Sequence, residues 1–118
     1  MDTTTAFLED LARHLDTWLA QGVVAMTDPS AELKWTDRPE AFRAIAPHLS
    51  TPECRAAVRT ALLELLSGLS HSFLVTLDGG TALAQQTTLS LTDSAGQELD
   101  LGLHERFYDH LFATGRFT

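Results

Sequence analysis

The feature that most constrains the fold is a run of apolar residues whose members follow one another at steps of three or four. The run consists of Val58, Leu62, Leu65 or Leu66, Leu69, Phe73 and Leu77. Residues three and four apart lie on the same side of an α-helix, so this spacing predicts one long helix with a single apolar face. The helix would be about 40 Å long if unbroken. Gly68 interrupts it, at a cost of about 1 kcal/mol relative to alanine.

Two capping boxes predict where helices begin. Asp37-Arg38-Pro39-Glu40 and Ser50-Thr51-Pro52-Glu53 each place a short polar side chain three residues before a glutamate, with proline in the first turn. The polar side chain can accept a hydrogen bond from a free N–H of the first helical turn, and the glutamate can accept one in return. We therefore expect a short helix over Arg38–His48 and the start of the long helix after Ser50.

The end of the long helix has a second interpretation. Phe73–Asp78 could form a strand, and Phe73–Thr81 (FLVTLDGGT) then resembles the strand–Asp–Gly–Gly–Thr start of sugar-kinase-like ATPases. That resemblance implies phosphate binding within a two-lobed fold much larger than 118 residues can form. We favour a helix, because the apolar spacing continues to Leu77 and Gly79 stands where a C-cap glycine belongs.

The remaining segments complete a mainly α (α+β) fold class. We expect a helix over residues 4–20 that stops at Gly22, an irregular stretch over 23–36, and a closing helix from Leu103 to Thr114 with Gly115 as its terminator. Between the long helix and the closing helix, alternating residues at 88–92 and 98–101 flank a polar turn and predict a β-hairpin.

The prediction is therefore a single small helical domain over residues 1–118, with a long central helix, one C-terminal β-hairpin and a closing helix. Its expected core is the apolar face of the long helix together with leucines and one phenylalanine from the other elements. These residues are Val58, Leu62, Leu66, Leu69 and Phe73, packed against Leu8, Leu11, Leu15, Leu89, Leu91, Phe107 and Leu111.

Charge and composition narrow the range of partners. The net charge is −8, with one lysine against seven arginines, so nucleic acids and anionic membranes are expected to be repelled. Polar residues interrupt the most apolar stretch, Ala61–Leu77, and we expect no membrane span there. A lone Cys54 and an N-terminus without a signal-peptide pattern lead us to expect a cytoplasmic protein.

Polar residues give one candidate ligand site. His71 and Asp78 are seven residues apart and share a face of the long helix, and His104 could join them in a cleft near Gly79-Gly80. His104 and His110 are six residues apart, about 240° around a helix, and cannot share a metal ion. We therefore expect no metal site, no cofactor and no catalytic residue.

The leading functional hypothesis is a non-enzymatic protein-interaction domain that meets a basic partner, for example an immunity or antitoxin protein that masks a nuclease. The candidate contact residues are acidic: Glu98, Asp100, Glu105 and Asp109. One alternative is a small metal- or ligand-binding protein that uses His71, Asp78 and His104. Another is a structural homo-oligomer, because the expected helix is long for a compact domain of this size and a second copy could cover one end.

Overall fold

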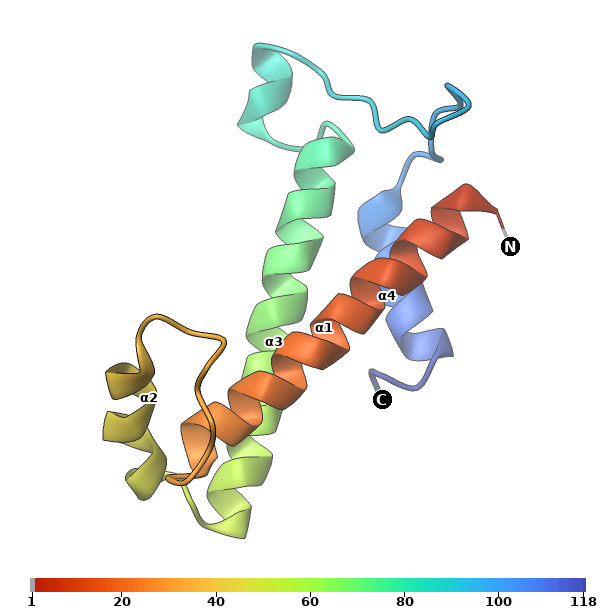
Figure 1. Ribbon diagram of the computed structural model, residues 1–118. Helices are drawn as coiled ribbons and strands as arrows, with labels where there is room; N and C mark the ends of the chain where they lie inside the picture. The colour runs from red at the N-terminus through yellow and green to blue at the C-terminus, as the bar shows by residue number, and fades with distance from the viewer. Residues whose placement is uncertain (1) are drawn as a thin grey trace. The chain divides into compact units, whose positions relative to one another are not determined.

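The computed structural model describes residues 2–118, and four α-helices account for most of them (Figure 1). The helices are α1 (Thr3–Thr27), α2 (Pro39–Ile45), α3 (Pro52–Leu77) and α4 (Leu103–Ala113), with short 3₁₀ helices at Ala46–His48 and Ala82–Gln85. Within residues 2–118 no segment forms a named strand. The mainly α class and the long central helix are confirmed, whereas the β part of the prediction is wrong.

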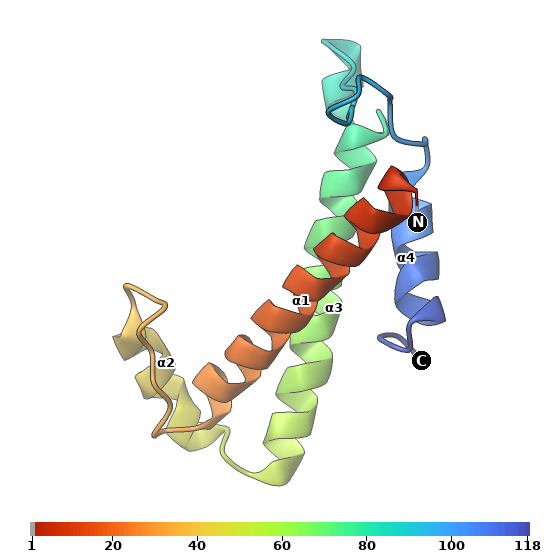
Figure 2. The ribbon, with the colours of Figure 1, turned by 45° about the vertical axis from the view of Figure 1, so that its right-hand side comes forward.

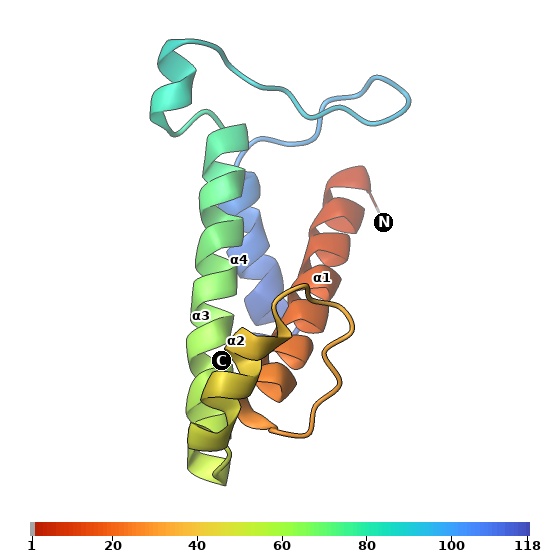
Figure 3. The same ribbon diagram turned by 60° about the vertical axis from the view of Figure 1, so that its left-hand side comes forward.

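The predicted hairpin does not form, although its turn does. Thr92 and Glu98 make an isolated antiparallel bridge, and the Asp93 carboxylate accepts hydrogen bonds from the N–H groups of Ala95 and Gln97 at 2.9 and 3.0 Å. Figure 3 shows the flanking chain as an open loop. The physical reason is burial: Leu91 and Leu99 are half-buried, but Leu89 is 43% exposed and Leu101 85%, so the outer leucines gain too little packing to extend two strands. The assignment of Leu89 to the core is therefore wrong.

The first helix passes through the glycine that was expected to stop it. α1 runs to Thr27, and an alanine methyl at Gly22 would lie 2.9 Å from the Cδ1 atom of Leu62. Gly22 therefore lets the side chain of Leu62 approach the backbone of α1. It contributes close packing inside a helix rather than a helix end.

The helix starts are predicted to within one or two residues, but neither capping box forms as expected. α2 begins at Pro39, and its N-cap residue Arg38 makes no side-chain capping bond. In α3 the cap is Thr51 rather than Ser50, because the Thr51 Oγ1 atom accepts the N–H of Cys54 at 3.2 Å. Proline at the first helical position makes the residue directly before it the N-cap.

The end of α3 settles the choice between helix and strand. The N–H of Gly79 donates to the carbonyl of Thr76 at 3.2 Å, and the N–H of Gly80 donates to that of Val75 at 2.9 Å. Gly79 has a φ of 79°. This pair of bonds around a left-handed glycine is a Schellman motif. The predicted helix through Leu77 and the predicted C-cap glycine are confirmed, and the strand required by the phosphate-loop resemblance is absent from residues 73–78.

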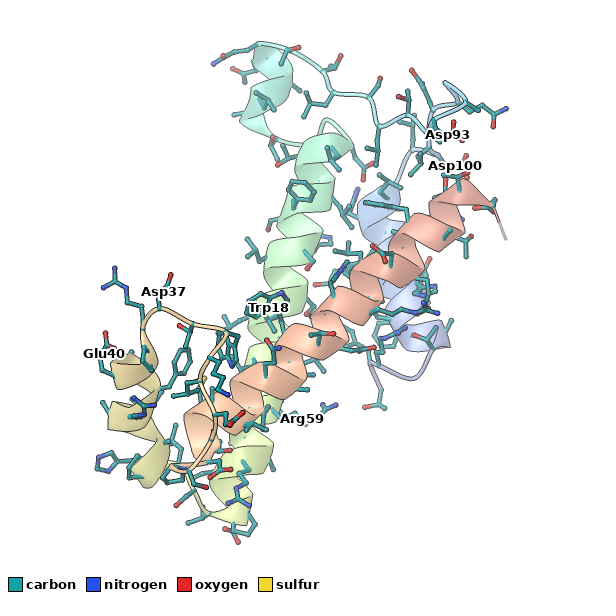
Figure 4. The ribbon with its side chains drawn as sticks, viewed as in Figure 1. Trp18, Asp37, Glu40, Arg59, Asp93 and Asp100 are labelled. Atoms are coloured by element: carbon teal, nitrogen blue, oxygen red, sulfur yellow. The ribbon has the colours of Figure 1, made fainter. Side chains whose placement is uncertain are left out.

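Two compact units make up the chain: one formed by residues up to His14 with Ser67–Thr118, the other by Leu15–Leu66. The second unit has an apolar core and an aromatic cluster. In the cluster, the Trp35 ring centroid lies 5.7 Å from that of Trp18 (labelled in Figure 4) and 5.4 Å from that of Phe42. The buried apolar residues of this unit are Leu15, Leu19, Ala25, Leu33, Ala46 and Val58.

The first unit contains the start of α1, the end of α3 and all of α4, and α4 lies along the C-terminal half of α3 (Figure 2). Its buried residues repeat at steps of four or seven along each helix, as expected of helix faces turned toward one core. They are Thr4, Leu8 and Ala12 of α1, Ser67 and Leu74 of α3, and Leu103, Phe107 and Leu111 of α4.

The predicted core face of α3 is correct for the first half of the helix only. Val58 is buried, but Leu69 is 71% exposed and Phe73 58%, so their assignment to the core is wrong. In the second half the buried residues are Ser67 and Leu74. Leu74 is five residues from Leu69, about 140° around the helix. The reason is that α4 packs on that other side, where His71, four residues from Ser67 and three from Leu74, contacts His104 and Tyr108 of α4.

Gly68, inside α3, and Gly79, at its C-cap, give a matched pair of substitutions that tests the surroundings and the backbone conformation of each glycine. A Cβ atom at Gly68 would have no atom within 4 Å, so we expect Gly68→Ala to raise the free energy of unfolding by about 0.5–1 kcal/mol. Gly79→Ala should lower it by about 1–2 kcal/mol, because a side chain disfavours the left-handed conformation. Urea unfolding, monitored by circular dichroism, measures the free energy of unfolding of both variants. A loss of stability in Gly68→Ala would contradict the open environment of Gly68.

Candidate functional site

The structure brings the three predicted ligand residues together at the junction between α3 and α4. The Nδ1 atom of His104 lies 2.5 Å from the Oδ2 atom of Asp78. The ring centroid of His71 lies 5.3 Å from that of His104 and 4.8 Å from that of Tyr108. Tyr108 is a member of this cluster that the sequence pattern did not indicate. We call these four residues the junction cluster.

Asp78 has a specific structural task in the junction cluster. Its Oδ1 atom accepts the N–H of Leu103 at 3.1 Å, and its Oδ2 atom accepts the N–H of His104 at 3.0 Å. These are N–H groups of the first turn of α4, which lack partners within the helix itself. The N-cap residue of α4, Gly102, has no side chain with which to satisfy them. Asp78 therefore caps α4 from the end of another helix, and its negative charge is favourable at that helix N-terminus.

The environment of Asp78 also determines its protonation. Its side chain is only 8% exposed, and burial by itself raises the pKa of the carboxyl. Hydrogen bonds from the backbone and ring of His104 and from the backbone of Leu103 outweigh burial. The pKa of Asp78 therefore lies below its ordinary value of 3.8. The carboxylate is ionised at neutral pH and holds α4 in place.

The junction cluster is built for packing rather than for ligand capture. Both carboxylate oxygens of Asp78 already accept hydrogen bonds from α4. The adjacent cavity, between Leu77, Leu103 and residues 89–101, has a volume of about 30 Å³, enough for one or two water molecules. Small-molecule pockets have volumes of about 300–1,000 Å³. Among residues 2–118, no group of three or more His, Cys, Asp or Glu side chains is placed to hold a metal ion.

Three of the four acidic candidates for partner binding have polar partners within the chain. Asp100, labelled in Figure 4, pairs with Arg106 at 2.5 Å. Glu98 accepts the hydroxyl of Ser90 at 3.3 Å, and a carboxylate oxygen of Glu105 lies 3.8 Å from the Nε2 atom of His104. Asp109 lines a shallow hollow beside Arg106 and His110. Asp100 and Glu105 nevertheless stay 68% and 79% exposed, so they remain available to a partner.

A second polar cluster was not anticipated from the sequence. Glu9 receives a hydrogen bond from Arg116 at 2.8 Å and lies 3.2 Å from the Nε2 atom of His110. The bond from Arg116 lowers the pKa of Glu9 more than burial raises it, and His110 adds to this effect, so that pKa lies below the ordinary value of 4.5. The cluster ties the C-terminal turn to α1. Glu9 is more than 100 residues away from both partners in the chain, so no local pattern could reveal it.

The largest departure from the expected surface is an exposed apolar face on α3. Leu69 and Phe73 are 71% and 58% exposed, and Leu65, one turn earlier on the same helix, is 70% exposed. Steps of four place these residues on one side of α3. We call them the α3 stripe. The stripe lies in the stretch Pro52–Gln85, which includes α3, its C-cap turn and the following 3₁₀ helix, and which is long and apolar enough by length and composition alone to cross a membrane. The expectation of no membrane span, drawn from the polar residues within Ala61–Leu77, stays a prediction.

Comparisons of the chain with protein-family models, with curated proteins and with solved structures found no match. Its function is therefore inferred from the geometry of the described residues.

The capping role of Asp78 predicts a pH-dependent loss of stability. Because the pKa of Asp78 is lower in the folded chain, the unfolded chain takes up a proton first as the pH falls. The stabilisation is complete above the ordinary value of 3.8 and is lost as the pH falls through the folded pKa. We expect Asp78→Asn to lower the free energy of unfolding by about 1–2 kcal/mol at pH 7 and by less at about pH 3.

Urea unfolding of both proteins at the two pH values measures this difference. Asp100→Asn is the matched control, since its exposed ion pair with Arg106 should contribute about 0–1 kcal/mol. If the difference in free energy of unfolding between wild type and Asp78→Asn is the same at both pH values, the capping role of the ionised carboxylate is contradicted.

Proposed function

We propose that this chain is a non-enzymatic protein-interaction module and that its contact surface is the α3 stripe. The observation that supports the proposal is the exposure of Leu69 and Phe73, at 71% and 58%, on a regular helix. Single exposed leucines are ordinary on protein surfaces. Leu65, Leu69 and Phe73 instead follow one another along one side of α3, and large exposed apolar patches commonly mark sites of protein or membrane contact.

The two polar clusters support the same proposal, because their charged groups already bond to other groups of the chain. The junction cluster holds α4, and the cluster around Glu9 holds the C-terminal turn. Their charged groups already have partners inside the chain, which fits a stabilising role better than a catalytic one. The stripe, by contrast, does little for the stability of the isolated chain, because its side chains remain in water.

A basic protein remains the second candidate partner. The net charge of −8 and the 79% exposure of the Glu105 side chain favour it, because complementary charge speeds association and selects partners. Such a partner would contact the acidic face that includes Glu105 and Asp109. An immunity or antitoxin role, in which the chain masks a nuclease, is one form of this second candidate.

Photo-crosslinking tests the stripe even while the partner is unidentified. A photoreactive phenylalanine analogue in place of Phe73 should give covalent adducts in cells that produce the chain. Phe112 is the matched control, because it is also a helical phenylalanine and is 55% exposed against 58% for Phe73. We expect adducts at position 73 and few or none at position 112.

Equal adduct yields at the two positions, or no adduct at position 73, would contradict the proposal. The same photoreactive analogue is also placed at position 105 or 109. Adducts at these positions, and none at position 73, would favour the basic partner. Circular dichroism of each variant verifies that the helices are intact.

A further inference from the structure

We propose that residues 115–118, which follow α4, form a pH-sensitive latch in which Arg116 and the ring of His110 compete for the carboxylate of Glu9. While His110 is neutral, the carboxylate holds Arg116 and the latch is closed. When His110 takes up a proton, its charge repels Arg116 and the latch opens. This inference goes beyond the proposed function and does not depend on the α3 stripe.

Backbone hydrogen bonds turn the latch back toward α4. The N–H of Arg116 donates to the carbonyl of Leu111 at 2.9 Å, and the N–H of Phe117 donates to the same carbonyl at 3.1 Å. Gly115 has a φ of 75°, which lets the chain reverse directly after the last turn of the helix. The latch is therefore held on the backbone side by two bonds to one carbonyl oxygen.

Side chains hold the closed latch in two further places. The guanidinium of Arg116 donates to the Oε1 atom of Glu9 at 2.8 Å. The ring centroid of Phe117 lies 5.6 Å from that of Tyr108 and 5.4 Å from that of Phe112. Because Glu9 is on α1, the ion pair ties the latch to a second helix.

His110 approaches the other oxygen of the same carboxylate. Its Nε2 atom lies 3.2 Å from the Oε2 atom of Glu9, and the side chains of Glu9, His110 and Arg116 are 19%, 16% and 17% exposed. A neutral imidazole can donate a hydrogen bond there without charge. A protonated one places a second positive charge beside the guanidinium, where little water screens their repulsion. His110 and Glu9 lie on regular helices, so the repulsion displaces the latch.

The other charged groups around His110 leave this competition in place. Arg13 of α1 lies 3.9 Å from the Oε1 atom of Glu9 and adds positive charge to the same site. Arg106 and Asp109 of α4 line the shallow hollow that His110 borders, and their opposite charges offset each other. Glu9 is thus the carboxylate that both competing cations contact.

Falling pH opens the latch in two steps. Histidine side chains titrate near neutral pH, so the charge on His110 acts first. The hydrogen bond from Arg116 keeps the pKa of Glu9 below its ordinary value of 4.5, so this carboxylate is still ionised during the first step. At more acid pH Glu9 also takes up a proton and no longer holds Arg116.

Opening changes the surface of α4. Phe117 leaves Tyr108 and Phe112, and Phe112 is already 55% exposed in the closed form. The latch therefore makes the amount of aromatic surface on α4 depend on pH.

Amide hydrogen exchange of Phe117, followed by NMR on the full chain, tests the latch. The protection factor of this amide reports the ratio of closed to open forms. We expect it to fall about two- to fivefold in the wild type between about pH 7.5 and about pH 5.5. In His110→Gln it should stay constant, because glutamine keeps a hydrogen-bond donor but takes up no proton. The Phe107 amide, in the buried face of α4, verifies that the helix is intact.

Arg116→Gln tests the same competition from outside the helix. We expect weak protection of Phe117 at both pH values and no pH dependence, because the charge that His110 repels is absent. His14→Gln is the matched control. His14 is an exposed histidine whose Nδ1 atom lies 3.5 Å from a carboxylate oxygen of Asp10, so this variant should keep the pH dependence of the wild type.

Two results would overturn the inference. One is a wild-type protection factor that does not fall between the two pH values. The other is a fall of equal size in His110→Gln or Arg116→Gln. His71→Gln covers the second route by which pH can reach Phe117, through the contact between His71 and Tyr108. A pH dependence that disappears in His71→Gln and persists in His110→Gln would assign the effect to the junction cluster and remove the role of His110.

Discussion

The contact on which the first unit depends is the carboxylate of Asp78 at the start of α4. It satisfies two N–H groups that Gly102 cannot cap and it holds the ring of His104. Its position follows from the way α3 ends, because the Schellman motif at Gly79 releases the chain directly after Asp78. With the first turn of α4 fixed there, Phe107 and Leu111 can enter the core of that unit.

Helical periodicity predicted which segments are helical, but not which face of each helix is covered. The long helix and its C-cap glycine followed from local spacing and turn chemistry, which depend on neighbours in the sequence. The covered face of α3 depends on elements far away in the chain. In its second half, α4 packs against the side of Ser67 and Leu74, so Leu69 and Phe73 remain exposed. Apolar spacing alone cannot separate a core face from a contact face.

The difference between local spacing and contacts of distant elements also explains which residues of the candidate site could be predicted. His71 and Asp78 could be paired from their spacing on one helix, and His104 proved to lie beside them. Tyr108 and the ion pair between Glu9 and Arg116 could not be anticipated, because those contacts form only when distant helices pack. The hairpin failed for a related reason. Its alternation was real, but Leu101 stays 85% exposed.

The cap that α3 provides for α4 has a consequence for how the chain opens. α4 has 11 residues, which is shorter than a helix that is stable alone in water. When the last turn of α3 frays, Asp78 leaves the start of α4 and exposes its N–H groups to solvent. The two helix ends then behave as one cooperative unit, whose amide protons exchange in the same opening event. A single carboxylate thus couples the local dynamics of segments 25 residues apart in the chain.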